Sequence, residues 1–185
     1  MSKEHLRNAI LDAAERAINA KGLSDTKMDD IAREAGISKG GVFYHFASKR
    51  LLLLAIIERY EQSLFALRDR YYNELPDQPF RKLKAMLLAL GEHPNRKKNN
   101  SAAILALLAD KDVRRAIGAL KEKLSREILD DAPDPSRAAL ALIIHDGMWV
   151  SELFGTNIYP AAVTAAIMDD LLGSFEIARA EAPCS

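Results

Sequence analysis

The sequence has little cysteine and no long hydrophobic stretch. Its one cysteine, Cys184, leaves no partner for a disulfide within the chain, which is typical of proteins kept in a reducing cytoplasm. The longest apolar run, Leu51–Ile57, has seven residues, whereas a membrane-spanning helix needs about 20. Charged residues also interrupt the N-terminal segment, which excludes a signal peptide's apolar core there. We therefore expect a soluble cytoplasmic protein with no membrane association.

Motifs of catalysis and metal binding are also missing. The four histidines are scattered at His5, His45, His93 and His145, and no HxxxH or CxxC spacing indicates a metal site. The sequence contains no phosphate-binding glycine loop and no nucleophile elbow. We therefore predict no catalytic residue, no metal and no cofactor, and a small helical enzyme is the weakest functional hypothesis.

The chain has no net charge, because 26 Lys and Arg residues balance 26 Asp and Glu residues. This balance argues against a globally basic nucleic-acid coat protein but leaves room for a local basic surface. Between Glu34 and Glu58 there is no acidic residue, while the same interval contains Lys39, Lys49 and Arg50. Such an acid-free basic segment is suited to neutralising phosphates.

Hydrophobic periodicity predicts helices almost everywhere and strands nowhere. Apolar residues recur at three- and four-residue steps, and turn residues divide the pattern into about nine helices, so the predicted fold class is all-α. Ser38, Ser48 and Asp110 are the expected N-caps. The first predicted helix ends at Gly22, the second covers 28–35 and the third begins at Lys39. The remaining six cover 49–73, 80–90, 101–109, 111–129, 135–154 and 161–180.

Two short helices joined by a glycine-containing turn are typical of a helix-turn-helix. The helix Met28–Ala35 is followed by the turn Gly36-Ile37 and by a helix that begins at Lys39. Helical spacing also predicts that Val42 and Phe46 are core residues. The residues that can form one small core are Ile31, Ala32, Ala35, Ile37 and Val42. The second helix of this motif enters the major groove of DNA, and the first crosses the backbone. Residues 1–48 are therefore expected to form a DNA-binding domain, and residues 49–185 a larger helical domain.

One segment resembles the N-terminal domain of the TetR family of transcriptional regulators: GLSDTKMDDIAREAGISKGGVFYHFASKRLLL. The resemblance covers roughly residues 5–60, and it implies a homodimer that binds a near-palindromic operator as a repressor. A small-molecule inducer in the C-terminal domain would release the operator. The matching positions are Gly22, Thr26, Ile31-Ala32, Ala35-Gly36, Ser38-Lys39-Gly40, Tyr44, Phe46 and Ser48-Lys49, followed by leucines.

The same resemblance implies which residues contact DNA. Lys39 falls where the family contacts base edges, Gly40 and Gly41 where the backbone approaches DNA, and Lys49 on the phosphate-binding lysine. Phe43 departs from the family, which usually has tyrosine there; its alternatives are a thymine methyl contact or the small core. The full implied set is Thr26, Lys27, Ser38, Lys39, Gly40, Gly41, Phe43, Tyr44, His45 and Lys49.

The sequence says less about the function of the later helices. The predicted helix 135–154 is apolar around its circumference, and in the family the last two helices usually form the dimer interface. A hydrophobic inducer would bind between the central helices, although ordinary core packing is the alternative for every candidate. Asp146 could be the counter-charge of a cationic ligand, or it could be paired within the protein or exposed at a helix edge. The candidates are Leu64, Leu67, Met86, Leu90, Leu105, Leu108, His145, Asp146, Met148 and Trp149.

Two further functional hypotheses stay open beside a ligand-responsive repressor. A helical carrier or adaptor would bind a small molecule without salt-dependent DNA affinity, and the acid-free basic segment argues against it. An activator of the same fold would differ in where its operator lies relative to the promoter. The sequence names neither the inducer nor the operator.

Overall fold

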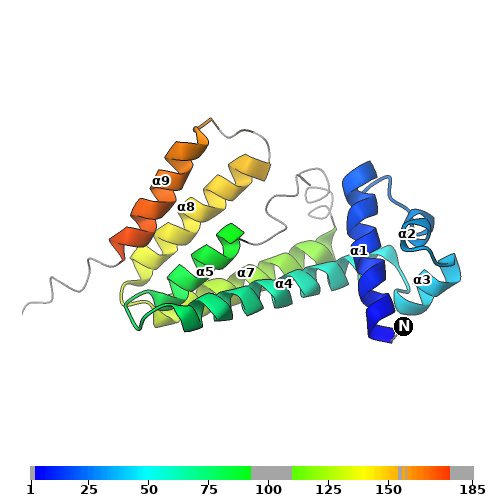
Figure 1. Ribbon diagram of the computed structural model, residues 1–185, viewed down its shortest axis with the longest axis horizontal. Helices are drawn as coiled ribbons and strands as arrows, with labels where there is room; N and C mark the ends of the chain where they lie inside the picture. The colour runs from blue at the N-terminus through cyan, green and yellow to red at the C-terminus, as the bar shows by residue number, and fades with distance from the viewer. Residues whose placement is uncertain (1–2, 93–109, 154–155, 157, 176–185) are drawn as a thin grey trace, which may run out of the picture. The chain divides into compact units, whose positions relative to one another are not determined.

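The computed structural model describes residues 3–92, 110–153, 156 and 158–175. These residues form eight helices and no strand, which confirms the all-α fold class (Figure 1). The predicted helix at 101–109 lies outside the described residues, as does the end of the predicted ninth helix beyond residue 175. The helices are α1 (Lys3–Lys21), α2 (Met28–Ala35), α3 (Lys39–His45), α4 (Lys49–Glu74), α5 (Arg81–Glu92), α7 (Lys111–Asp131), α8 (Pro135–Leu153) and α9 (Ala161–Ser174).

The three predicted N-caps are confirmed. The Ser38 hydroxyl accepts a hydrogen bond from the Gly41 N–H at 3.1 Å, and the Ser48 hydroxyl accepts one from the Leu51 N–H at 3.2 Å. The Asp110 carboxylate accepts from two backbone N–H groups of α7, the nearer at 2.9 Å. These bonds satisfy backbone donors that a helix start otherwise leaves without partners.

The chain divides into two compact units. The first unit comprises residues 1–62 and 97–120, and the second comprises 63–96 and 121–185. Both α4 and α7 contribute residues to each unit without a break. The domain boundary predicted after residue 48 therefore stays a prediction, since α4 is continuous from residue 49 through the change of unit.

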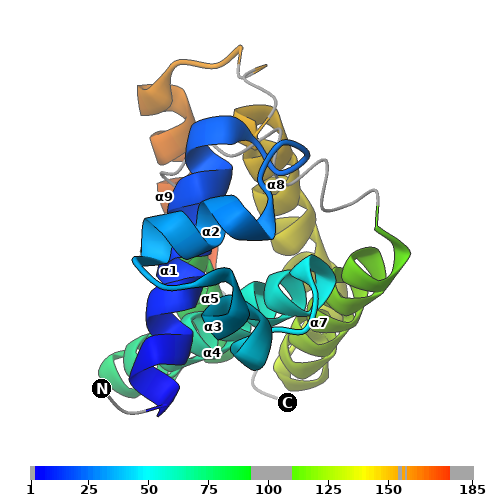
Figure 2. The same ribbon diagram turned by 90° about the vertical axis from the view of Figure 1, so that its right-hand side faces the viewer.

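The core of the first unit is built around α1, α2 and α3. Figure 2 shows α2 crossing α1, and α3 follows it closely in the chain. Ile31 and Val42 are fully buried in this core, and Val113 at the start of α7 joins them. The predicted small core is confirmed, because Ile31, Ala32 and Val42 are buried and Ala35 and Ile37 pack against them.

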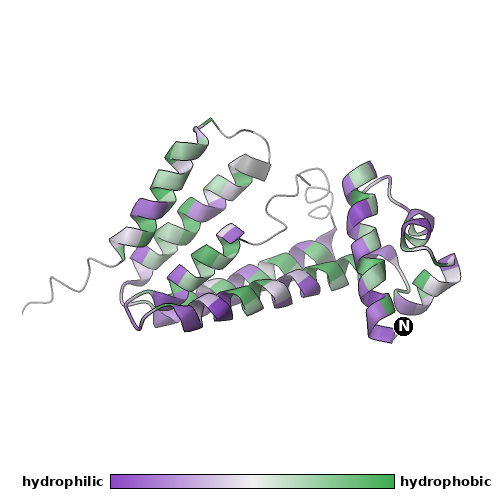
Figure 3. Cartoon of the chain, in the orientation of Figure 1, coloured by the Kyte–Doolittle hydropathy of each residue, from purple (hydrophilic) through white to green (hydrophobic). Residues whose placement is uncertain are grey.

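The second unit has a buried core and also exposes large apolar side chains on α8 and α9. Buried residues include Leu83 and Met86 of α5 and Ala141 of α8. None of the residues 161–174 of α9 is buried, although Figure 3 shows this helix as largely apolar. Leu140, Ile143, Val150, Val163 and Ile167 are large apolar residues that α8 and α9 expose.

Within the described ranges, no single helix has the length and apolar character needed to cross a membrane. The bent pair α3 and α4, taken together, passes that test by length and composition alone.

Candidate nucleic-acid interface

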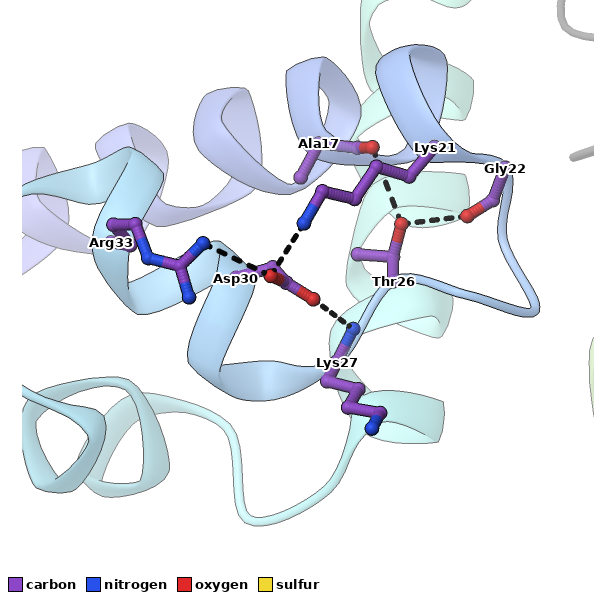
Figure 4. Close-up of polar contacts among 7 residues, drawn as sticks. All are labelled: Ala17, Lys21, Gly22, Thr26, Lys27, Asp30 and Arg33. Atoms are coloured by element: carbon purple, nitrogen blue, oxygen red, sulfur yellow. Dashed lines mark hydrogen bonds and ion pairs between the residues drawn. The ribbon is translucent and has the colours of Figure 1, made fainter.

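Asp30 fixes the start of α2. Its carboxylate accepts hydrogen bonds from Lys21 Nζ at 2.7 Å, the Lys27 N–H at 3.0 Å and Arg33 Nη1 at 3.3 Å (Figure 4). These donors, Lys21 foremost, lower the pKa of Asp30 to about 2, so the carboxylate stays charged at neutral pH. The ion pair with Lys21 ties α2 to the end of α1.

Thr26 has a structural position and does not face outward. Thr26 is 1% exposed. Its hydroxyl donates a hydrogen bond to the Gly22 carbonyl at 2.6 Å, and the Ala17 carbonyl lies 3.2 Å from the same hydroxyl oxygen (Figure 4). The expectation that Thr26 contacts DNA is therefore corrected. This hydroxyl is used to close the turn between α1 and α2, and Lys27 beside it is the exposed residue.

The turn between α2 and α3 depends on Gly36. Its φ of 67° lies in the left-handed region that glycine adopts without steric cost. The Gly36 N–H bonds the Arg33 carbonyl at 3.2 Å, and the Ile37 N–H bonds the Ala32 carbonyl at 3.0 Å. These bonds end α2 and let Ser38 cap α3 immediately, which gives the short two-helix geometry that the sequence predicts.

One side of α3 is buried and the other is exposed. Val42 is fully buried and Phe46, directly after the helix, is 4% exposed, as the sequence predicts. Tyr44 is 73% exposed and Phe43 is 40% exposed, so Phe43 is not a core residue. His45 is half-buried and meets the Tyr44 ring edge-to-face, with 5.3 Å between the centroids. The exposed aromatic rings are therefore held on a helix that is anchored from behind.

The fold itself does not require glycine at residues 40 and 41. A Cβ at Gly41 would lie 3.4 Å from Ile37 Cδ1, and one at Gly40 would lie 3.9 Å from Ser38 Oγ. Both distances are ordinary van der Waals contacts. Both glycines are helical without a positive φ, so neither packing nor backbone geometry explains them. The close approach of DNA that the resemblance implies stays a prediction.

We expect Gly41→Ala to stabilise the protein and weaken DNA binding. Alanine favours a helix over glycine by up to about 1 kcal/mol, while the added methyl group would hold DNA away from the α3 backbone and reduce affinity about tenfold. Urea unfolding and fluorescence anisotropy measure the two effects. Gly118→Ala is the matched control, because Gly118 is an exposed residue of α7 with open space around it. Equal DNA affinity of both variants would contradict this explanation of Gly41.

Three basic residues in and beside α3 have partners within the protein. Lys39 Nζ lies 2.9 Å from the Asp29 carboxylate, and Lys49 Nζ donates to the Leu23 carbonyl. Burial lowers the pKa of Lys49, and Asp25 opposes that shift. Arg50 is paired with Asp112 at 2.6 Å.

The start of α1 contributes basic residues that the sequence analysis missed. Lys3 Nζ lies 5.5 Å from the centroid of the Tyr44 ring, and the Arg7 guanidinium lies 5.3 Å from that of Phe46. The four-residue spacing of Lys3 and Arg7 places them on one side of the helix. That spacing was the available signal, but only the packing of α1 shows that this side adjoins α3.

The proposed ligand-lining residues that can be described lie in the second unit. Leu64, Met86 and His145 are buried, whereas Leu67, Leu90, Met148 and Trp149 are half-buried. Leu105 and Leu108 lie outside the described residues. Burial of this kind also arises in an ordinary helical core, so the set stays a prediction. No group of residues in the described part could hold a metal ion.

Asp146 is paired within the protein, which is one of the alternatives that the sequence left open. Its carboxylate pairs with Lys121 Nζ at 2.6 Å, and the two side chains are 45% and 56% exposed. It is therefore an exposed, paired residue and not a buried counter-charge. We leave it out of the ligand site.

Comparison with known proteins gives two family matches. A model described as "Bacterial regulatory proteins, tetR family" matches residues 10–56, and one described as "Tetracyclin repressor-like, C-terminal domain" matches residues 77–175. The first match contains α2, α3 and their connecting turn. The second covers more than half of the chain.

Individual relatives are transcriptional regulators. The regulator AcrR of Shigella flexneri is 32% identical over 85 residues, or 46% of this chain and 40% of AcrR. SrpR of Pseudomonas putida is 43% identical over 54 residues, or 29% of this chain and 25% of SrpR. The chain thus spans less than half the length of these two relatives. BetI of Escherichia coli is 29% identical over 160 residues, 78% of this chain and 80% of BetI.

Solved structures share the fold. A TetR transcription regulator from Haloarcula marismortui superposes with a TM-score of 0.70 at 19% identity, covering 93% of this chain and 98% of that one. The multidrug binding protein EbrR, complexed with malachite green, superposes with a TM-score of 0.65 at 20% identity, covering 89% and 96%. At these identities the likeness establishes the fold alone.

Proposed function

Because this chain belongs to the TetR family of bacterial transcriptional regulators, we propose that it is a repressor that binds a palindromic operator as a homodimer. Members of this family are regulators and not enzymes. A protein that binds chromosomal DNA in this way would lie in the cytoplasm. A small-molecule inducer, bound by the second unit, would release the operator.

The observation that carries the proposal is the two-sided character of α3. Val42 and Phe46 are buried against the core, while Lys39 at the start of the helix and Tyr44 near its end are exposed. A helix held in this way can enter a major groove without losing its packing. Lys39 is suited to guanine O6 and N7, and Lys27 and Lys49 to phosphates.

The dimer is supported by α9. This helix is apolar and yet has no buried residue in the single chain, and the exposed Val163 and Ile167 lie on it. Exposed apolar surface of this extent usually marks an interaction site. A second copy of the chain is the partner that a two-fold operator requires, with recognition helices about 34–36 Å apart.

Induction is proposed to be a population shift. A hydrophobic ligand that binds one arrangement of the second unit more tightly would favour that arrangement. Both α4 and α7 contribute residues to both units, so a change in either helix reaches the DNA-binding unit through the chain itself. The malachite green bound by EbrR is an example of a ligand in a protein of this fold.

Selection from random duplexes, followed by anisotropy titration, tests DNA binding. Wild-type protein is expected to enrich a palindrome and bind it with an affinity that falls as salt rises. Lys39→Ala should reduce the affinity for this duplex at least about tenfold. The control is Lys82→Ala, which removes one charge and breaks an exposed pair with Asp131 at 3.1 Å in the second unit.

Two results would count against the proposal. One is the absence of any enriched sequence at moderate salt. The other is an equal effect of Lys39→Ala and Lys82→Ala, since both lose one positive charge but only Lys39 lies on α3. A carrier without DNA affinity predicts the first result.

A further inference from the structure

The lysine at the start of α3 is held by a carboxylate from α2. Lys39 Nζ lies 2.9 Å from Asp29 Oδ1 and 3.2 Å from Oδ2. The two side chains are 60% and 55% exposed, so the pair is open to solvent and adds little to stability. The pair can still affect DNA binding, because Lys39 is one of the proposed DNA contacts.

Lys39 is the one charged side chain that α3 offers before His45, since the residues between them are Gly40, Gly41, Val42, Phe43 and Tyr44. A free lysine is a flexible point charge that binds any phosphate it can reach. The ammonium group has three N–H donors. With Asp29 engaged through both oxygens, at least one donor remains, and its direction is set by Asp29.

Asp29 also brings a negative charge to a surface that approaches phosphates. Such a charge repels the DNA backbone, which opposes binding to every sequence. This repulsion is partly offset where the Lys39 ammonium meets a suitable base. Asp29 has already ordered the Lys39 side chain, so binding there no longer costs the entropy of ordering it.

We propose that Asp29 is a positioning residue that determines the sequence specificity of the interface. It directs Lys39 toward a base acceptor and withholds it from phosphates. The ion pair therefore raises the ratio of operator affinity to general DNA affinity, although it lowers the latter. This inference rests on the proposed operator binding and adds to it the residue that makes Lys39 selective.

The test compares two duplexes over a salt series: the palindrome selected by the wild type and a scrambled duplex of the same composition. For Asp29→Asn we expect the affinity ratio to fall about tenfold. On the scrambled duplex we expect tighter binding and a log–log salt slope steeper by about 0.9, because Lys39 gains one phosphate. In a Lys39→Met background, Asp29→Asn should leave the ratio unchanged.

The chain offers a matched control. Glu34, also on α2, pairs with Arg16 at 2.7 Å, and its side chain is 43% exposed. Glu34→Gln therefore makes the same charge change and breaks a similar pair that involves no residue of α3. It should shift the affinity for both duplexes equally and leave the ratio at the wild-type value.

Asp29→Glu keeps the charge and moves the carboxylate by one methylene. We expect it to lower the ratio while the salt slope stays at the wild-type value, so it tests the proposal even if Asp29→Asn folds poorly. An unchanged ratio in both Asp29 variants, or a change equal to that of Glu34→Gln, would overturn the inference. A wild-type protein that selects no duplex would instead overturn the proposed function.

Discussion

Replacing Ile167 with glutamate is expected to dissociate the proposed dimer and to weaken operator binding at least about a hundredfold. Ile167 is 38% exposed on α9, a helix with no buried residue in the single chain, so the folded subunit tolerates a polar side chain there. In the dimer the same glutamate would be an unpaired charge in an apolar interface. A monomer engages one half-site and loses the advantage of the second, which is about 10²–10⁴ in affinity.

The measurements are sedimentation velocity for the oligomeric state and anisotropy for the operator. Ala119→Glu is the control, because Ala119 is an exposed residue of α7 and the change adds the same charge outside α8 and α9. It should remain dimeric and bind as wild type. An Ile167→Glu protein that is still a dimer with full affinity would move the interface away from α9.

The helix-turn-helix could be predicted from the sequence because its signals are local. Ser38 and Ser48 cap helices through backbone groups three residues away, and Gly36 supplies a positive φ within the turn itself. The three- and four-residue spacing of apolar residues within each short helix was enough to assign Ile31 and Val42 to the core. Signals of this kind lie within one turn of chain and do not depend on distant packing.

The partners of polar residues could not be predicted in the same way. Thr26 matched the family pattern, yet its hydroxyl is buried on carbonyls of α1 and the following turn. Lys39 was assigned to DNA without its partner Asp29, and Asp146 without its partner Lys121. The Thr26–Gly22 bond spans only four positions, but the other three pairings join residues at least nine positions apart. Those three are determined by how helices pack and not by local spacing.

Hydrophobic periodicity identified α8 and α9 as apolar but not which side of each is covered. In α8, Ala138 and Ala141 are buried while Ile143 is 67% exposed. In α9 no residue is buried. The pattern alone does not distinguish residues that face the subunit's own core from residues that would face a partner.

Phe175, directly after α9, is the residue that anchors this helix to its unit. It is 1% exposed, and its ring centroid lies 4.7 Å from that of Phe80. Arg137 of α8 lies over the Phe175 ring at 5.6 Å and donates to the Ser174 carbonyl at 2.7 Å. Phe80 has a φ of 60°, which is unfavourable outside glycine, and its burial against Phe175 offsets that cost.

Phe175→Ala should lower the free energy of unfolding by about 3–5 kcal/mol, because it removes a fully buried ring and leaves a cavity. Urea unfolding measures this loss. Phe43→Ala is the matched control: Phe43 is 40% exposed on α3, so the same truncation should cost less than about 1 kcal/mol. Equal losses for the two variants would contradict the anchoring role of Phe175.

The two large predictions are separable because they act on α9 in different ways. Ile167→Glu should abolish the dimer and leave subunit stability nearly unchanged, since no residue of α9 is buried in the single chain. Phe175→Ala should reduce both, because α9 without its anchor no longer presents a fixed surface to the partner. If Phe175→Ala lost stability but dimerised with wild-type affinity, α9 would be held in place by its partner and not by its own unit.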